Sequence, residues 1–331
     1  MTMANGEQSG ETVKEALISL VVPVYNEQDV LATFFSRVEP VAAEIITTID
    51  RIARVEVVFV DDGSTDQTVE RILAHHSEVL DLKLVKLSRN FRKDSALAAG
   101  LVHASGAAVI PMDVDLQDPP EVIVQMVSAW LDGAKVINAK RASRDRDSFF
   151  KRTSSRMFYK VINRLSEYPI EADVGDFRLF DRQVVEVLND MPERVRFMKG
   201  MFAWVGFTPV TVEYDRDERA NGESKWDYWK LWNFALDGIT GSTTLPIRAW
   251  TYFGFCVAVL AVVFAVFLVL RTLIFGIDVP GYASLMVITL FLGACNLIAL
   301  GMMGEYIGRL TIETKKRPVF VVDEVIERKS R

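Results

Sequence analysis

Short apolar runs alternate with amphipathic stretches along the first 140 residues. The apolar runs are rich in β-branched residues and predict buried strands; they are Leu17–Tyr25, Val55–Val60, Leu82–Leu87, Ala107–Met112 and Val136–Ala139. The stretches between them predict helices; these are about Gln28–Glu44, Thr68–His76, Asp94–Ala104 and Pro120–Leu131. Strands that alternate with helices form a parallel sheet with helices on both faces. We therefore predict an α/β, doubly wound domain with a mainly parallel sheet.

Two long stretches without charge dominate the last third of the chain. Ala249–Leu270 spans 22 residues and Val279–Gly304 spans 26, and neither contains a charged side chain. At 1.5 Å per residue, each can cross a hydrocarbon layer of about 30 Å as a helix. A buried helix of a soluble core is the alternative, but such helices are typically about 10–14 residues long. We predict two transmembrane helices, at 249–273 and 280–304.

The flanking charges predict how these spans are oriented. Arg248 precedes the first span, and Arg309 and Lys315–Arg317 follow the second, whereas the connection carries only Arg271 and Asp278. By the positive-inside rule, the large N-terminal domain and the C-terminal tail at 305–331 lie in the cytoplasm.

Polarity and β-branching predict the structure at the two ends of the chain. The polar segment 1–16 has no apolar core of a signal peptide and predicts a disordered start. In the tail, Arg317–Val322 predicts one short strand that pairs with another subunit.

Composition excludes several classes of site and partner. The only two cysteines, Cys256 and Cys295, fall inside the predicted spans, so the soluble part has no disulfide framework. Three histidines in all argue against a multi-histidine zinc site and against a Ser-His-Asp triad. Any catalytic metal is then held by oxygen ligands, which favours Mg²⁺ or Mn²⁺. The net charge of −6 argues against a nucleic-acid partner.

Polar residues cluster where the predicted strands end, which is the edge at which parallel sheets bind ligands. The clusters are Asn26–Glu27, Asp61–Asp66, Ser88–Asn90 and Asp113–Asp115. No G-x-G-x-x-G or P-loop motif is found, which argues against a dehydrogenase or a nucleoside triphosphatase.

The carboxylates of Asp113 and Asp115, with Gln117 nearby, are typical of a site in which a metal bridges a diphosphate, although D-x-D alone is a weak signal. Asp61–Asp66 has two readings, a turn that caps the next helix or a carboxylate that accepts from a nucleotide base.

Three downstream segments combine positive charge with membrane proximity. Arg219–Lys225 forms a short Arg, Gly, Ser and Lys loop that is suited to close over a diphosphate. Trp226–Leu236 holds three tryptophans and predicts an amphipathic interfacial helix within 225–248, with a packed soluble helix as the alternative. The basic stretch Lys140–Arg156 is either a solvated face or a site for the phosphate of a lipid acceptor.

Several motifs together resemble the family-2 inverting glycosyltransferases of GT-A fold. They are Val22–Glu27, Asp61–Asp66, Asp113–Pro119 and Gly175–Leu179. Met198–Gly200, Lys230–Asn233 and Gly304–Arg309 further resemble the bactoprenol (undecaprenyl-phosphate) glucosyltransferases of O-antigen modification, which are relatives of dolichol-phosphate mannose synthase. The resemblance covers about residues 17 to 320 and implies a GT-A domain at 17–224.

The resemblance implies that glucose passes from UDP-glucose to undecaprenyl phosphate on the cytosolic face of the bacterial inner membrane, giving a β-linked lipid. It further implies a homo-oligomer, a tetramer in members of known architecture. The roles implied for residues of this chain are nucleotide binding for Pro23, Tyr25, Glu27, Asp62 and Asp113; metal binding for Asp113, Asp115 and Gln117; catalysis for Asp115 and Asp176; diphosphate binding for Arg219, Ser224 and Lys225; and acceptor-phosphate binding for Arg141, Arg152 and Arg156.

The role of Asp176 is limited by the chemistry of the acceptor. A phosphate monoester has a second pKa near 6, so its oxygen is already anionic at neutral pH and needs no strong general base. We therefore predict that Asp176 orients the donor or basic neighbours more than it removes a proton.

Other functions remain open from the sequence. The same scaffold serves other donors, such as mannose, N-acetylglucosamine or aminoarabinose derivatives, because sugar pockets differ by few hydrogen bonds. A transporter or non-enzymatic membrane scaffold is a second class, but the spans lack the charged groups of a polar pathway. A processive polysaccharide synthase typically has more spans and a Q-x-x-R-W motif, which is not found here.

Overall fold

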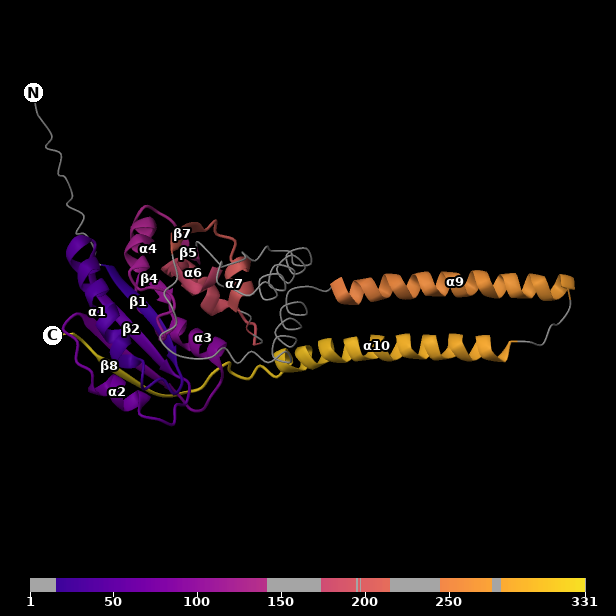
Figure 1. The fold of residues 1–331 in the computed structure, drawn as a ribbon, viewed down its shortest axis with the longest axis horizontal. Helices are drawn as coiled ribbons and strands as arrows, with labels where there is room; N and C mark the ends of the chain where they lie inside the picture. The colour runs from indigo at the N-terminus through magenta and orange to yellow at the C-terminus, as the bar shows by residue number, and fades with distance from the viewer. Residues whose placement is uncertain are drawn as a thin grey trace, which may run out of the picture.

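The computed structural model describes residues 16–141, 174–214 except 195 and 197, 245–275 and 281–330. Figure 1 shows a domain at one end of the molecule, from which two long helices project. The described strands are β1 Ala16–Val24, β2 Ile52–Asp61, β3 Leu80–Leu87, β4 Ala108–Pro111, β5 Val136–Arg141, β6 Val174–Asp181, β7 Val210–Tyr214 and β8 Val322–Arg328. The described helices are α1 Leu31–Thr48, α2 Thr68–Ala74, α3 Lys93–His103, α4 Val122–Leu131, α6 Arg182–Asp190, α7 Met198–Trp204, α9 Leu245–Phe275 and α10 Tyr282–Thr314.

The described strands form one sheet in the order β7-β5-β6-β4-β1-β2-β3-β8. The central strands β4, β1, β2 and β3 are mutually parallel, as the alternating pattern predicts. β6 runs antiparallel to both β4 and β5, and β8 runs antiparallel to β3. The mainly parallel α/β sheet is therefore confirmed, and the predicted strands and helices up to residue 139 appear with shifts of a few residues at their ends.

Each face of the sheet has its own apolar core. On one face, α1 and α4 pack over the strands with residues such as Phe34, Phe59 and Met126, all of which are buried. On the other face, α3 and α6 contribute Leu97 and Val184 to a second core. The sheet is thus covered on both sides, which explains why its central strands read as continuous apolar runs.

The C-terminal strand corrects one prediction. The sequence placed a strand at Arg317–Val322 and paired it with another subunit, whereas the structure places β8 at Val322–Arg328 and pairs it with β3 of the same chain. β8 has no buried residue and is rich in charge, as is common in edge strands, so no apolar run marks it in the sequence. The backbone N–H of Ser88 also donates to the carbonyl of Val321, at 2.9 Å. Residues expected to be a free tail therefore close one edge of the sheet.

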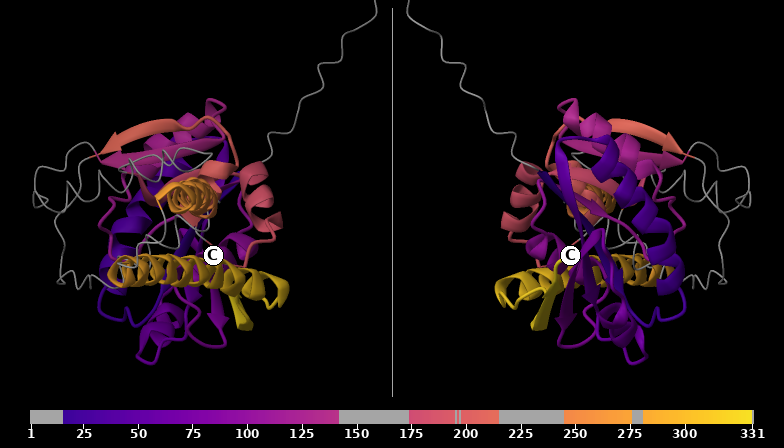
Figure 2. Two further views of the ribbon diagram at one scale, coloured as in Figure 1. Left: turned by 90° about the vertical axis from the view of Figure 1, so that its right-hand side faces the viewer. Right: turned by 90° about the vertical axis from the view of Figure 1, so that its left-hand side faces the viewer.

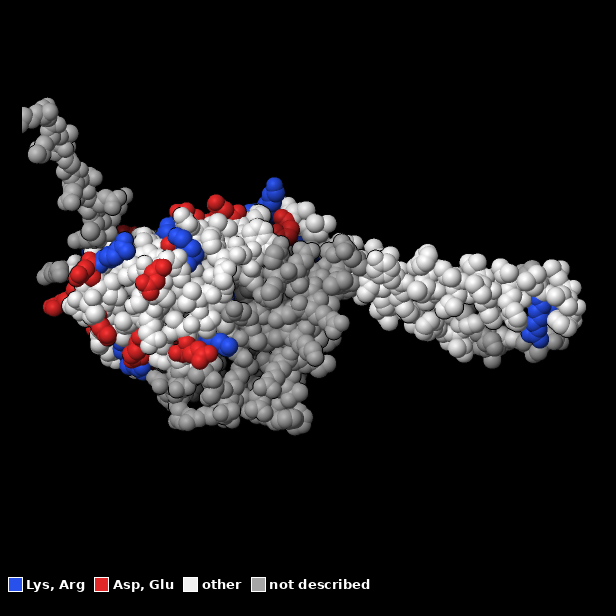
Figure 3. Space-filling model, turned by 90° about the horizontal axis from the view of Figure 1, so that it is seen from above, with Lys and Arg blue, Asp and Glu red and all other residues white. Residues whose placement is uncertain are grey.

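The two projecting helices expose apolar side chains along their length. In space-filling view the projection is almost free of charge, in contrast to the domain (Figure 3). Seen along α9, α10 lies across the view, so the two helices are inclined to each other (Figure 2). By length and composition, one helix among the described residues, Leu285–Thr314, is able to cross a membrane. The apolar stretch found in α9, Ala249–Phe264, is shorter.

The end of α10 is attached to the domain. Both carboxylate oxygens of Glu313 accept from the backbone N–H of Arg194, at 2.9 and 3.0 Å. Downstream, Phe320 and Val322 pack against the core under α3. The chain thus returns from the projection directly onto the sheet.

Asp181, at the end of β6, connects three elements. Its carboxylate accepts from the backbone of Gln183 at 3.1 Å, from Trp130 Nε1 at 2.9 Å and from Lys135 Nζ at 3.2 Å. Burial acts to raise the pKa of Asp181, but the hydrogen bonds from Trp130, Gln183 and Lys135 outweigh it and lower the pKa. The charged form is therefore favoured in the folded state.

Asp181→Ala removes a helix cap and leaves Trp130 without this partner, so we expect a loss of about 1–2 kcal/mol in unfolding free energy. Because the folded pKa is lowered, this stabilisation is present above the unfolded value of about 4 and disappears as pH falls below it. Apparent melting temperatures of detergent-solubilised wild type and variant, measured from pH 3 to pH 7, test this. An equal difference at every pH would contradict it.

Candidate active site

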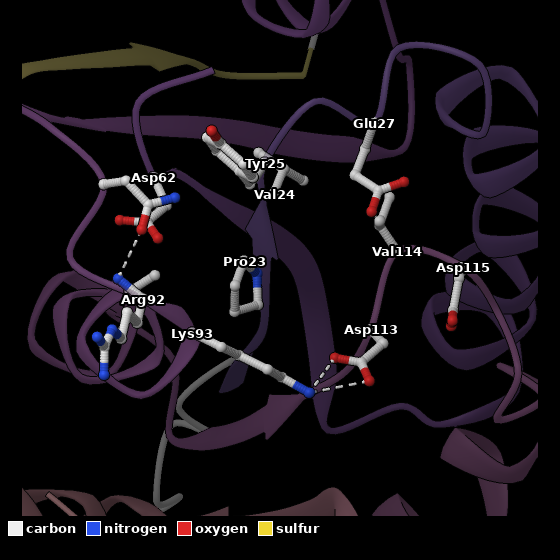
Figure 4. Close-up of a pocket in the computed structure, with 12 residues that line it drawn as sticks. Pro23, Val24, Tyr25, Glu27, Asp62, Arg92, Lys93, Asp113, Val114 and Asp115 are labelled. Atoms are coloured by element: carbon white, nitrogen blue, oxygen red, sulfur yellow. Dashed lines mark hydrogen bonds and ion pairs between the residues drawn. The ribbon is translucent and has the colours of Figure 1, made fainter. Parts of the chain in front are cut away.

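A cavity of about 350 Å³ opens at the carboxyl ends of the central strands. It is lined by Pro23, Val24, Tyr25, Glu27, Asp62, Asn90, Arg92, Lys93, Ala96, Asp113, Val114 and Asp115. These residues lie at the end of β1, in the loops after β1, β2, β3 and β4, and in the first turn of α3. β1 lies between β4 and β2, where the strand order reverses. This is the position at which doubly wound sheets bind nucleotides. Figure 4 shows acidic groups on several sides of this cavity.

The loops around the cavity have unusual backbone conformations. Asn26, Arg92 and Leu116 have positive φ angles of 55°, 76° and 50°, which are uncommon for residues other than glycine. Each lies just beyond the end of a central strand. Gly63, at φ 79°, has its Cα packed so closely on the next loop that a Cβ would lie 2.9 Å from the backbone N of Asn90. The rim is thus held in one specific shape, as is common at functional sites.

In the Asp61–Asp66 turn, two carboxylates hold the turn together and a third lines the cavity. Asp61 accepts from Ser64 N at 3.1 Å, and Asp66 accepts from Thr68 N at 3.0 Å at the start of α2. The capping turn is therefore present. Asp62 lines the cavity and accepts from the backbone N–H of Phe91, at 2.6 Å. Burial raises the pKa of Asp62, and backbone hydrogen bonds oppose this effect.

Lys93, the first residue of α3, joins two of the predicted carboxylates. Its Nζ lies 2.7 Å from Oδ1 and 3.0 Å from Oδ2 of Asp113, and 3.0 Å from Oδ2 of Asp176. In Figure 4 the side chain of Lys93 runs beneath Pro23 to reach Asp113. Burial disfavours the ammonium, but the two carboxylates outweigh it and raise the pKa of Lys93. Lys93 is therefore charged across the physiological range.

Negative charge is concentrated on the side of the cavity that faces β4. Burial raises the pKa of Glu27, and the charges of Asp115 and Asp113 raise it further. Burial also raises the pKa of Asp113, and the Lys93 ammonium offsets part of this effect. Asp115 is exposed, and Gln117 Nε2 donates to its Oδ2 at 2.6 Å.

These oxygen ligands fit a hard divalent cation, which would relieve their repulsion. In the described part of the chain, no three His, Cys, Asp or Glu residues are arranged to hold a metal by themselves. A bound ion would therefore take its remaining ligands from a diphosphate, as Mg²⁺ commonly does.

The structure brings most predicted site residues of the described chain together. Pro23, Tyr25, Glu27, Asp62, Asp113 and Asp115 line the cavity, with Gln117 and Asp176 in contact with lining residues. Arg141 ends β5, and its side chain is outside the described part. Arg152, Arg156, Arg219, Ser224, Lys225 and the predicted interfacial helix also lie outside the described residues.

The sequence-based prediction included Asn90 in a strand-end cluster but missed Arg92 and Lys93. They follow a strand end like the other rim residues, within the segment Ser88–Lys93, and this position was the available signal. The segment looked like an ordinary basic helix start, so only its first three residues were noticed.

Comparison with known proteins gives three related findings. The model of "Glycosyl transferase family 2" matches residues 19–188. An uncharacterized glycosyltransferase of Synechocystis is 47% identical over 308 residues, covering 93% of this chain and 95% of that protein. The bactoprenol glucosyl transferase of Shigella phage SfV is 48% identical over 307 residues, covering 92% and 97%.

Among solved structures, a mannosyltransferase from Pyrobaculum calidifontis in complex with GDP-Man and Mn²⁺ matches with a TM-score of 0.44 and 22% identity. The match covers 67% of this chain and 61% of that one.

Proposed function

Because this chain belongs to glycosyl transferase family 2, we propose that its cavity binds UDP-glucose and transfers glucose to undecaprenyl phosphate, giving a β-linked lipid. The near full-length similarity to a bactoprenol glucosyl transferase supports this donor and acceptor. The observation that carries the proposal is the convergence of Asp62, Asp113 and Asp115 on one cavity at the reversal point of the sheet. This point of a doubly wound sheet is where nucleotides bind, and carboxylate oxygens can hold a cation that is bound to the diphosphate of the donor.

The reaction exchanges one bond at the sugar. A phosphate oxygen of the acceptor attacks C1 of glucose from the face opposite to UDP, the bond from C1 to the UDP oxygen breaks, and UDP leaves as an anion. The configuration at C1 is therefore inverted. Because the acceptor oxygen is already anionic near neutral pH, no proton has to be removed for the attack.

The residues of the chain bind and orient the two reactants. Asp62 and Tyr25, at the ends of β2 and β1, are positioned for the nucleoside. Asp113, Asp115 and Gln117 would hold Mg²⁺ or Mn²⁺, which when bound would neutralise charge that develops on the diphosphate. The contact between Asp176 and Lys93 supports an orienting role for Asp176.

A membrane position follows from the projecting helices. We infer that α9, a helix of 31 residues, spans the bilayer together with α10, because both expose apolar side chains along their length. Both helices then cross the bacterial inner membrane, with the catalytic domain and β8 on the cytosolic side. The homo-oligomer, expected to be a tetramer, stays a prediction, as do the roles of Arg141, Arg152, Arg156, Arg219, Ser224 and Lys225.

The direct test uses the full-length protein in detergent or liposomes. It is incubated with undecaprenyl phosphate, with Mg²⁺ or Mn²⁺, and with one radiolabelled nucleotide sugar at a time from a panel that includes UDP-glucose. We expect label from UDP-glucose to enter the lipid fraction, with a loss of this signal on chelation. Label from another sugar alone would change the donor, and growth of long chains would indicate a processive synthase.

A further inference from the structure

We propose that Lys93 is a positioning residue of the transfer reaction, whose single ammonium group holds Asp113 and Asp176 side by side at the cavity wall. The inference rests on the proposed function, since it assigns Asp113 to the donor side and Asp176 to the reacting sugar. It adds a residue that the sequence patterns leave unassigned.

The pairing of β4 with β6 brings Asp113 and Asp176 close together. Asp113 follows β4, Asp176 lies in β6, and these strands pair in antiparallel register, with Ala108 opposite Asp181 and Val109 opposite Phe180. Asp113 lies two residues beyond the end of β4, so this pairing brings its loop to the side of β6 that carries Asp176. Two carboxylates that share one site repel each other. A positive group between them removes this conflict, and Lys93 Nζ contacts both carboxylates at 3.0 Å or less.

Lys93 constrains a carboxylate on the donor side of the cavity. Lys93 Nζ lies within 3.0 Å of both oxygens of Asp113, so the ammonium fixes the orientation of the carboxylate as well as its position. A carboxylate that binds a diphosphate-bound cation needs a defined orientation, because small misplacements cost catalytic rate. Lys93 thus sets the positions of a donor-side carboxylate and a sugar-side carboxylate from one atom.

A second lysine, Lys83, shows how Lys93 differs from a lysine that only stabilises the fold. Lys83 also bridges two carboxylates, with Nζ 3.7 Å from Glu56 and 3.2 Å from Glu327. Its side chain is only 13% exposed, and it lies away from the cavity-lining residues. Lys93 is 48% exposed and lines the cavity. Lys93 thus joins its two carboxylates at the cavity, where their positions affect the chemistry, whereas Lys83 joins its two away from it.

Steady-state kinetics of Lys93→Met test the proposal, because methionine keeps most of the unbranched side chain and removes the ammonium. We expect kcat to fall at least tenfold, but less than the roughly 100-fold that a misplacement of 1 Å costs. The KM for the nucleotide sugar should stay within about threefold, since nucleoside contacts are unchanged. Lys93→Arg should recover most of the loss, because a guanidinium also bridges two carboxylates. Lys83→Met is the matched control, and its kcat should be that of wild type.

A double variant shows whether Lys93 acts through Asp176. If it does, the loss in Lys93→Met/Asp176→Asn should be at least tenfold smaller than the product of the two single losses. Independent, fully multiplicative losses would overturn the proposal. If Lys93→Met does not fold, as judged by its melting curve, Lys93→Gln replaces it in both assays.

The outcomes separate this inference from the proposed function. Wild type that transfers no sugar to the lipid would remove both. Active wild type with an unchanged kcat in the Lys93 variants would leave the glycosyl transfer intact and remove only the role of Lys93. A higher KM with an unchanged kcat, without rescue by arginine, would likewise contradict it, because Lys93 would then only bind substrate.

Discussion

Asp115→Ala should lower glucosyl transfer by about 1,000-fold while the protein stays folded, an effect comparable to loss of a main electrostatic contact to the leaving group. Asp115 is exposed at the cavity, and its described side-chain contact is to Gln117, so its removal costs little packing. The loss should appear in kcat, because neutralisation of the departing diphosphate matters most in the transition state.

The measurement is the initial rate of label transfer to lipid at saturating donor and acceptor, with the melting temperature recorded in parallel. Asp132→Ala is the control, since Asp132 is an exposed carboxylate at the end of α4, remote from the lining residues. If Asp115→Ala glycosylates the lipid at the unmodified rate, the assignment of this rim as the diphosphate site is wrong.

Asp176→Asn should lower kcat by about 100-fold, within the range of residues that orient reacting groups. Asparagine keeps the size of the side chain but loses the charge that pairs with Lys93 at 3.0 Å. Because the acceptor oxygen is already anionic, the rate should fall at every pH, and the pH–rate profile should keep its shape.

A general base would behave differently. With Asp176 as the base, the wild-type rate would fall at low pH as the carboxylate becomes protonated, and the variant would lose this acid limb alone. The two profiles, measured with constant ionic strength, distinguish the roles. Asp190→Asn, at the exposed end of α6, provides a control for the loss of one negative charge.

The central half of the fold was predictable because its signals are local. β1 and β2 are buried on both faces, so their sequences are continuous apolar runs that identify a strand without any knowledge of its neighbours. The carboxyl ends of the parallel strands β2 and β4 then place Asp62, Asp113 and Asp115 at one edge of the sheet. These three residues line one cavity at that edge.

The remaining parts depend on long-range pairing. β6 has charged residues at Asp176 and Arg178, and only its position between β4 and β5 makes it a core strand. The contact between Lys93 and Asp176 joins residues 83 positions apart, through a strand order that no local pattern encodes. β8 was misplaced for the same reason, since most of its residues are exposed and only its pairing with β3 makes it a strand.

The return of the chain through β8 has a mechanical consequence. Glu313, at the end of α10, accepts a hydrogen bond from the backbone N–H of Arg194. The residues that follow join the sheet, where the backbone N–H of Ser88, a few positions before Lys93, donates to the carbonyl of Val321. The domain is therefore attached to α10 both through Glu313 and through the pairing of β8 with β3, and not through a single flexible connection. With α10 in a bilayer, as we propose, this attachment would hold the reaction centre at a fixed height above the lipid, and the acceptor would reach it by diffusing in the membrane.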